Sequence, residues 1–354
     1  MKILFIADGC HPGTQGGIQT FGRALKKMFD KNLIFLSDYV IDRKNLLYNI
    51  EDNIEIGSKN LLFRIVNKIS NNFLRNYLKE RNIKKIKPDI CILRSPQNLK
   101  LLKNINCKKI LVQHTQLDVY FRSKSYYNSN SGLFDFSKEE LDYFIVTSKQ
   151  DREKLINNFK FPSEKVKIIR HSCELEILKE NKEKKKILVM IARLCNEDKR
   201  FDLAIKAMKR IPDFNLKIYG SGPDKESLKN LIKENNIKNV ELCGPTNQVK
   251  EKLDEAGIFV MTSDYESYGI VNIEAMRRGL PIIIRNTFEG ASDVVINNGI
   301  LLDSEWNEQE FCNGIRKIYE NYDYYSKNST EMGKRHSLDV IKKEWEALFN
   351  SFGE

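Results

Sequence analysis

Long apolar runs are absent from this chain. No segment approaches the roughly twenty consecutive apolar residues that a membrane-spanning helix needs. The N-terminus has the pattern of a β-strand and lacks the features of a secretory signal peptide. We therefore expect a cytoplasmic protein.

Paired cysteines and metal-binding motifs are also lacking. The seven cysteines are scattered without a C-x-x-C pair, and most of them lie among apolar residues. This distribution favours buried, reduced thiols over disulfides or a zinc site. We expect no metal site.

Basic residues outnumber acidic ones and give a formal net charge of +11, but the motifs of nucleic-acid readers are missing. No recognition helix, RNP motif or zinc finger accompanies the charge, so we expect no nucleic-acid partner. Of the four histidines, His171 and His336 are assigned structural roles.

The length of 354 residues exceeds one typical domain core and suits two domains of similar size. Strand and helix patterns alternate along the chain, which predicts two α/β, doubly wound halves with parallel sheets. Residues 174–186 lose apolar periodicity in a charge-rich stretch typical of an exposed linker. We predict domains at 1–172 and 173–335, followed by a C-terminal helix at 336–354.

The segment from Glu266 to Glu274 is the most informative one. The apolar run at 257–262 predicts a buried strand, 263–268 a loop, and 269–278 a helix. Free N–H groups at such a helix start bind anions, and the two carboxylates offer acceptors for sugar hydroxyls. Two glutamates at this spacing also occur by chance as solvated surface residues, so the pair alone does not decide the function.

The complete string, with its flanking residues, resembles the E-x7-E signature of the retaining glycosyltransferases of family 4, the glycosyl transferases group 1. Four further stretches resemble that family in the same order. They are an N-terminal strand and loop with Gly16 and Gly17, His114 after a strand at 109–113, Arg193 and Lys199 after a strand at 186–192, and the turns at Gly220, Gly222 and Gly244.

The resemblance covers nearly the whole chain and implies the GT-B architecture. In that fold two Rossmann-like, doubly wound domains face a central cleft, and a C-terminal helix crosses back to the first domain. Apolar residues at helical spacing between Ser329 and Phe352 predict an amphipathic helix there. Trp345 either anchors the crossing or packs in an ordinary core.

The resemblance also implies the roles of individual residues. Arg193 and Lys199 would hold the donor diphosphate, Glu266 would approach hydroxyls of the donor sugar, and His114 would lie close to that sugar. Glu274 would bind the ribose, and amides from Tyr268 to Val271 would meet the distal phosphate. The full donor-binding set comprises Gly16, Gly17, Gly220, Gly222, Ser267, Tyr268, Gly269, Ile270, Val271 and Glu274.

The implied reaction transfers a hexose or a derivative from a nucleoside diphosphate sugar, with a UDP-sugar preferred, and retains the anomeric configuration. The acceptor would be a glycan or a polyprenol-linked sugar in bacterial surface polysaccharide assembly. No metal and no side-chain nucleophile are required. Two alternatives stay open, because fold alone does not fix function: a GT-B isomerase (epimerase) of nucleotide sugars, and a non-catalytic sugar-nucleotide-binding scaffold at the membrane.

A basic amphipathic stretch lies between Lys59 and Lys87. It holds nine basic residues and one acidic residue, Glu80, interleaved with apolar ones. Such a stretch either holds the protein on an anionic membrane surface, as a peripheral protein on the inner face, or forms a packed helix with a solvated face.

Overall fold

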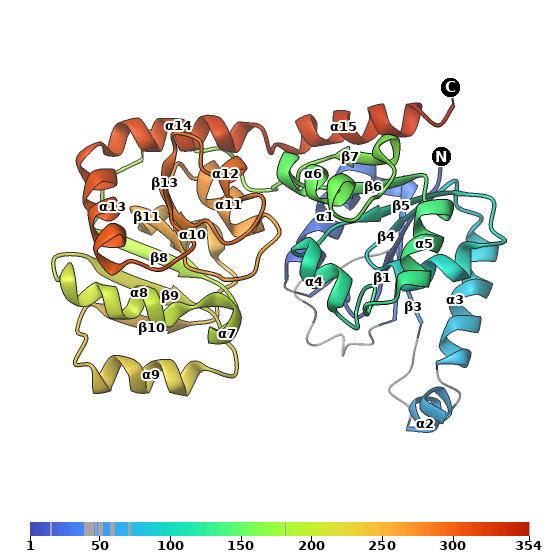
Figure 1. Cartoon of the computed structure of the whole chain (residues 1–354), viewed down its shortest axis with the longest axis horizontal. Coiled ribbons are helices and arrows are strands. Elements are labelled where there is room, and N and C mark those ends of the chain that lie inside the picture. Colours follow the sequence, from blue (N-terminus) through green and yellow to red (C-terminus); the bar gives the residue numbers. More distant parts are fainter. Residues whose placement is uncertain are drawn as a thin grey trace. The chain divides into compact units, whose positions relative to one another are not determined.

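Two compact units make up the chain. The computed structural model describes residues 1–14, 16–38, 46, 48, 52–56, 61–69, 72–180 and 182–353. The first unit comprises Met1–His171 together with Ile341–Glu354, and the second comprises Ser172–Val340. Each is an α/β unit in which helices flank a parallel sheet (Figure 1).

The first unit contains a seven-stranded sheet in the order β3-β2-β1-β4-β5-β6-β7, with all described pairings parallel. Its strands are β1 (Ile3–Ala7), β2 (Leu33–Ser37), β3 (Asn53–Glu55), β4 (Ile90–Leu93), β5 (Lys108–Val112), β6 (Tyr143–Val146) and β7 (Val166–Ile168). Its helices are α1 (Gly17–Phe29), α2 (Leu61–Ile69), α3 (Phe73–Ile86), α4 (Leu117–Arg122), α5 (Ser131–Glu140), α6 (Lys149–Asn157) and most of α15 (Leu338–Asn350). The central strand β1 is buried along its whole length, as expected for an apolar strand covered on both faces.

The second unit contains a six-stranded parallel sheet in the order β10-β9-β8-β11-β12-β13. Its strands are β8 (Ile187–Ile191), β9 (Asn215–Tyr219), β10 (Val240–Gly244), β11 (Ile258–Met261), β12 (Ile282–Arg285) and β13 (Gly299–Leu302). Its helices are α7 (Asn196–Lys199), α8 (Phe201–Ala207), α9 (Lys225–Glu234), α10 (Val249–Glu255), α11 (Ile270–Arg277), α12 (Ala291–Val294), α13 (Glu308–Glu320) and α14 (Tyr322–Lys334).

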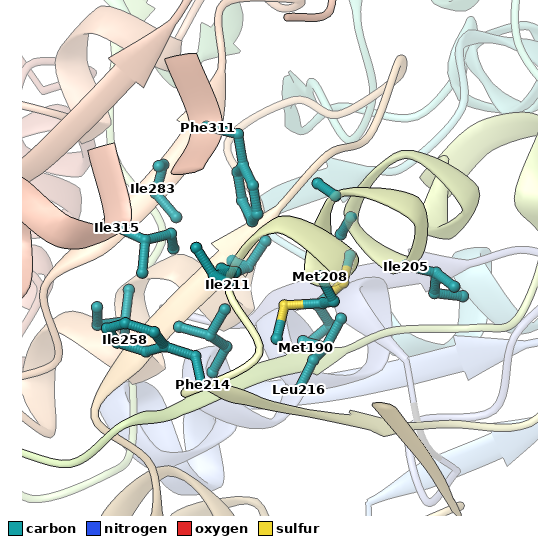
Figure 2. Packing of buried hydrophobic residues seen from close by; sticks show 14 of the residues in the cluster. Met190, Ile205, Met208, Ile211, Phe214, Leu216, Ile258, Ile283, Phe311 and Ile315 are labelled. Atoms are coloured by element: carbon teal, nitrogen blue, oxygen red, sulfur yellow. The ribbon is translucent and has the colours of Figure 1, made fainter. Parts of the chain in front are cut away.

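One face of this second sheet packs against α8 and α13 through a continuous apolar core (Figure 2). Met190 and Leu216 from the strands meet Met208 from the segment after α8, while Phe311 and Ile315 come from α13. These side chains are almost completely buried. A packed core of this kind fixes the strand ends on which the candidate site is built.

The last residues of the chain pack with the first unit. Trp345 of α15 is 1% exposed, and its ring lies 6.4 Å from that of Phe21 in α1. Farther along, Phe349 lies 5.3 Å from Phe29, and the hydroxyls of Tyr143 and Ser351 are 3.0 Å apart. The predicted return of a C-terminal helix to the first domain is therefore present, and Trp345 has a core position.

The single amphipathic helix predicted between Ser329 and Phe352 is wrong in one respect, because the chain forms α14 and α15 with a break at 335–337. His336 in the break is fully buried, and its Nε2 lies 3.3 Å from the Tyr268 hydroxyl. Ser337 then accepts a hydrogen bond from the Val340 amide, as an N-cap does. The buried imidazole and the new cap separate the two helices.

The charge-rich segment at 174–186 does not behave throughout as an exposed linker. Lys182 is buried and donates to the carbonyls of Leu253 and Asp254 at 2.8 and 2.6 Å. Nearby, Arg278 donates to the Glu176 carbonyl at 2.8 Å. The segment is docked on the second unit because its backbone and one lysine satisfy buried polar groups there.

Candidate functional site

The strand order of the second sheet reverses between β8 and β11, with β9 and β10 on one side of this pair and β12 and β13 on the other. These neighbouring strands are paired in parallel, and the strand order runs outward from them on both sides. In open α/β sheets, ligands bind at such a point, outside the carboxyl ends of the strands. The loop after β8 carries Arg193, the short helix α7 that follows ends at Lys199, and the loop after β11 carries Glu266.

Lys199 and Glu266 meet across this point. The Lys199 Nζ lies 2.5 Å from the Glu266 Oε1, and the Ser263 hydroxyl donates to the same oxygen at 3.4 Å. The two charged side chains are 20% and 17% exposed, so the pair is partly shielded from water but still reachable. Two residues that are 67 positions apart in the sequence are thus brought into direct contact.

The backbone carrying Lys199 is fixed by the strand beside it. The hydroxyl of Thr262 donates to the carbonyls of Lys199 and Arg200 at 3.0 and 2.8 Å. The Asp264 amide donates to the Asp198 carbonyl at 2.8 Å. Arg200 adopts the left-handed conformation, with a φ of 50°, between α7 and α8. A non-glycine residue keeps this conformation only where its surroundings hold it, as they do here.

A charged network that was not predicted from the sequence supports this turn. Asp264 accepts hydrogen bonds from Arg200 at 3.1 Å and from Arg285, which is buried at the end of β12. Arg285 also donates to the Thr262 carbonyl at 3.0 Å. The signal that could have identified Arg285 is a cation closing the apolar strand Ile-Ile-Ile-Arg, because a charge beside a buried strand requires a partner.

The N-terminus of α11 opens beside the Glu266 loop. Gly269, its N-cap, has a φ of 73°, which glycine adopts without steric cost. The first amides of a helix have no partner within it and are suited to bind an anion; in α11 these are the amides at Gly269, Ile270 and Val271. The Asn272 side chain donates to the Tyr268 carbonyl at 2.8 Å and fixes the entry to the helix.

Tyr268 can take part in such a site only through its backbone. Its side chain is completely buried, and its hydroxyl lies 3.3 Å from the His336 Nε2. This places the ring in the core of the second unit. Ser267, the residue before it, is partly exposed.

Lys199 and Glu266 both line a small hollow. Its lining residues come from β8, β11 and the loops after them, the end of α7, and the starts of α8 and α11. They are Met190, Ile191, Ala192, Lys199, Phe201, Phe259, Val260, Met261, Ser263, Glu266 and Val271. An apolar wall with a few charged groups at one side is typical of a small-ligand site.

Gly220 and Gly222 allow the turn after β9 to approach the loop that carries Arg193. A Cβ on Gly220 would lie 1.9 Å from the Ala192 carbonyl oxygen, and one on Gly222 would lie 2.3 Å from that of Leu194. Any larger residue would therefore force the two loops apart. Arg193 itself lies between these contacts with an exposed side chain.

Glu274 lies on α11, one helical turn past the anion-binding amides. Its carboxylate is partly exposed and stands near Cys173. Burial, with the added charge of Glu274, raises the pKa of the Cys173 thiol to about 12. The thiol is therefore protonated and unreactive at neutral pH.

The other predicted site residues belong to the first unit. His114 follows β5, and its ring stacks on that of His171 at 6.0 Å and meets Phe21 edge-on at 5.1 Å. Burial, together with His171 and the Arg94 charge, holds the pKa of His114 well below its usual value, so the imidazole is neutral. Gly16 and Gly17 form the start of α1, where Gly16 is the N-cap.

The structure thus brings Lys199, Glu266 and the start of α11 together within one unit, while His114, Gly16 and Gly17 lie in the other. Among the described residues, no group of three or more histidine, cysteine, aspartate or glutamate side chains is arranged to hold a metal ion. The same part of the chain has no helix with the length and apolar character needed to cross a membrane.

A protein-family model matches a segment that lies within the second unit. Residues 174–336 match the family model Glycosyl transferases group 1. The matched range contains Arg193, Lys199, Glu266 and Glu274, and it supports the coarser part of the predicted resemblance, a GT-B glycosyltransferase.

Curated relatives extend the comparison. An uncharacterized glycosyltransferase of Haemophilus influenzae is 34% identical over 160 residues, which cover 42% of this chain and 45% of the relative. A poly(ribitol-phosphate) alpha-N-acetylglucosaminyltransferase of Staphylococcus aureus is 26% identical over 316 residues, covering 84% of this chain and 63% of the relative. The chain spans less than two thirds of the length of both relatives.

Solved structures share the fold of the whole chain. The crystal structure of TarM has a TM-score of 0.78 at 16% identity and covers 99% of each chain. The lipopolysaccharide outer core galactosyltransferase WaaB has a TM-score of 0.74 at 19% identity, covering 99% of this chain and 100% of the other. The predicted GT-B fold, with two Rossmann-like α/β units, is confirmed.

Proposed function

We propose that this chain is a retaining glycosyltransferase of family 4. It transfers a hexose or a derivative from a UDP-sugar to a glycan or polyprenol-linked acceptor during bacterial surface polysaccharide assembly in the cytoplasm. The observation that carries the proposal is the contact of Lys199 with Glu266, whose Nζ and Oε1 atoms are 2.5 Å apart. The pair lies near the N-terminus of α11, at the point where the strand order of the sheet reverses.

The chemistry of the leaving group supports this assignment. When a nucleoside diphosphate departs, negative charge develops on its phosphate oxygens, and fixed cations and helix amides stabilise that charge. Lys199, Arg193 and the amides from Gly269 to Val271 supply both kinds of group. In this proposal they do so without a metal ion, while Glu266 approaches hydroxyls of the donor sugar and Glu274 those of the ribose.

The departing phosphate itself takes the proton of the acceptor hydroxyl on the face from which it leaves. No side-chain nucleophile is assigned, and the two glutamates are not a glycosidase pair, which would flank a single bond. His114, as a neutral imidazole, acts as a hydrogen-bonding group near the donor sugar in this proposal. Gly16 and Gly17 lie under the donor.

The names of similar proteins support the donor, the linkage and the process. A Staphylococcus aureus TarM mutant has been solved with UDP and alpha-GlcNAc-glycerol, and Anabaena HepE has been solved with UDP and glucose. A Bacillus subtilis relative is a poly(glycerol-phosphate) alpha-glucosyltransferase, and an Escherichia coli relative is an O-antigen biosynthesis glycosyltransferase. An alpha product is what retention yields from an alpha-linked nucleotide sugar. These relatives do not favour the isomerase or scaffold alternatives.

The test is acceptor-dependent release of UDP. Purified protein is incubated with UDP-sugars, with and without short glycan or polyprenol-linked acceptors, and with a chelator in parallel. The proposal expects UDP release that requires the acceptor and survives chelation, together with a product whose anomeric proton has the configuration of the donor. Conversion of the nucleotide sugar without an acceptor would instead identify an isomerase.

A further inference from the structure

Exposed apolar side chains are concentrated at one corner of the first unit. Of the exposed large apolar residues in the described part of the chain, half lie between Leu62 and Tyr77. Ile69 is 80% exposed and Phe73 is 70% exposed. The group on α2 and α3 comprises Leu62, Ile65, Val66, Ile69, Phe73 and Tyr77. Apolar residues clustered in this way on a solvent-exposed face are typical of an interaction surface.

The corner between α2 and α3 is held together by two asparagines. The Asn67 side chain donates to the Asn72 side-chain oxygen at 2.9 Å, and the Asn72 amide donates to the Asn67 carbonyl at 2.7 Å. The Arg75 amide then donates to the Asn67 side chain at 3.1 Å. These bonds tie the end of α2 to the start of α3, and the two helices follow one another at one end of the unit (Figure 1).

The exposed face of α3 continues from this tip into basic residues. Phe73, Tyr77, Arg81 and Lys84 follow one another at intervals of three or four residues, which places them on one side of the helix. From Tyr77 to Arg81 the rise along the axis is about 6 Å. The exposed basic residues of α3 therefore start about one helical turn after its last exposed apolar residue, Tyr77.

Not every basic residue of the predicted stretch contributes to this face. Lys79 is 2% exposed and pairs with Asp8 and Asp38 at 2.5 and 3.1 Å, and Arg75 lies 3.4 Å from Asp38. These two residues anchor α3 to the segments that follow β1 and β2, as the packed-helix alternative predicts for part of the stretch. Among the side chains that the structure describes, the exposed cations are Lys68, Arg81, Lys84, Lys85 and Lys87; Lys59 and the side chain of Arg64 lie outside this description.

We propose that this corner docks on an anionic lipid bilayer. Ile65, Val66, Ile69, Phe73 and Tyr77 enter the interface, and the exposed cations of α3 contact the lipid headgroups. An apolar face edged with lysine and arginine binds anionic leaflets by both burial and charge attraction. A second copy of the chain fits this surface less well, because a symmetric contact would place the same basic residues opposite each other.

The surface is distinct from the nucleotide site and belongs to the other unit, so the two assignments fail separately. The proposed function gives it a purpose, because a polyprenol-linked acceptor resides in a membrane. Binding to vesicles needs no donor or acceptor, whereas UDP binding reports on the groups proposed to hold the diphosphate, Arg193, Lys199 and the start of α11.

Vesicle co-sedimentation of the full chain tests the proposal. Vesicles of phosphatidylcholine alone are compared with vesicles that also contain phosphatidylglycerol. Two variants are measured beside the natural protein: I69D with F73D, and K84E with K85E. Each is expected to lower the affinity for anionic vesicles by roughly tenfold or more. Apolar burial and charge attraction add up in such binding, and each variant removes two of the contributing side chains.

The matched control is Tyr324→Asp, which changes an aromatic residue of α14 that is 56% exposed in the second unit. It is expected to sediment like the natural protein. Equal binding of all variants, or no preference for anionic vesicles, would overturn the proposal. Association of the natural protein in solution that the I69D with F73D variant abolishes, without vesicle binding, would also overturn it and assign the surface to a second copy. UDP titration of the same variants should be unchanged.

Discussion

The Nζ of Lys199 lies 2.5 Å from the Oε1 of Glu266. Lys199 ends the short helix after β8, and Glu266 lies in the loop after β11. Their contact therefore links the two strands between which the strand order reverses. A diphosphate that binds Lys199 must compete with this carboxylate or share the ammonium with it. In the proposed function, the pair therefore influences both the affinity for the leaving group and the position of the sugar beside it.

Replacing Lys199 by alanine is expected to weaken UDP binding by about 2 kcal/mol, or roughly thirtyfold in Kd, because one charge-assisted hydrogen bond to phosphate is lost. Isothermal titration calorimetry measures the change. Lys206→Ala is the matched control, since Lys206 is an exposed lysine on the neighbouring helix α8. Equal losses in the two variants would mean that only the overall charge of the protein matters.

Glu266→Gln is expected to separate binding from transfer. Removal of the carboxylate leaves Lys199 available to phosphate and should tighten UDP binding a few-fold, as expected for a partly exposed ion pair. The same change should lower kcat by roughly a hundredfold, because a hydrogen-bonding group near the donor sugar is weakened in the transition state. Calorimetry and steady-state kinetics on one preparation give both values. Weaker UDP binding would contradict the competitive role assigned to Glu266.

Arg285→Leu is expected to destabilise the second unit by about 3 kcal/mol, because Asp264 and buried carbonyls would lose a charged partner. Urea unfolding followed by Trp306 fluorescence in a Trp345→Phe background reports on that unit, since each unit holds one of the two tryptophans. The control is Arg316→Leu, whose exposed side chain lies 3.7 Å from Asp213 and should contribute less than about 1 kcal/mol. A similar loss in both variants would contradict the bracing role of Arg285.

The first unit is expected to lose stability on mild acidification. Burial lowers the pKa of His171 to about 4 from its ordinary 6.5. Between these values the unfolded chain binds a proton that the folded chain does not, so stability falls as the pH decreases through this range. His171 alone contributes a loss of roughly 2 kcal/mol from pH 7 to pH 5.

Trp345 fluorescence in a Trp306→Phe background measures this loss, because Trp345 packs near Phe21, whose ring is 5.3 Å from that of His171. His171→Phe keeps an aromatic ring but removes the titrating group. Its unfolding free energy should fall less between pH 7 and pH 5. An unchanged pH dependence in this variant would show that other groups cause the acid sensitivity.

The strands and the helix around the candidate site were predictable from the sequence. The apolar run at 257–262 corresponds to β11 at Ile258–Met261, and the helix predicted at 269–278 corresponds to α11 at Ile270–Arg277. These elements follow from patterns within a few residues, namely an apolar run and a glycine at a helix start. The anion-binding helix start follows from the same local signals.

Contacts between distant residues could not be predicted in this way. Lys79 belongs to an apparent basic stretch, but its partner Asp8 lies 71 residues away and removes it from the surface. The bracing of Asp264 by Arg200 and Arg285 likewise depends on which strands become neighbours. The break at His336 depends on a buried partner, Tyr268, that is 68 residues distant. Tertiary contacts determine the burial of Lys79, the bracing of Asp264 and the break at His336. The local sequence pattern does not predict such contacts.

The proposed function requires that the second unit binds the nucleoside diphosphate of a sugar donor at the carboxyl ends of β8 and β11. Calorimetric titration of the natural protein with UDP, GDP and ADP measures this binding. Saturable one-to-one binding that is tightest for UDP is expected. Absence of binding by all three nucleotides at millimolar concentration would contradict it, and preference for GDP would overturn the assignment of a UDP-sugar as donor.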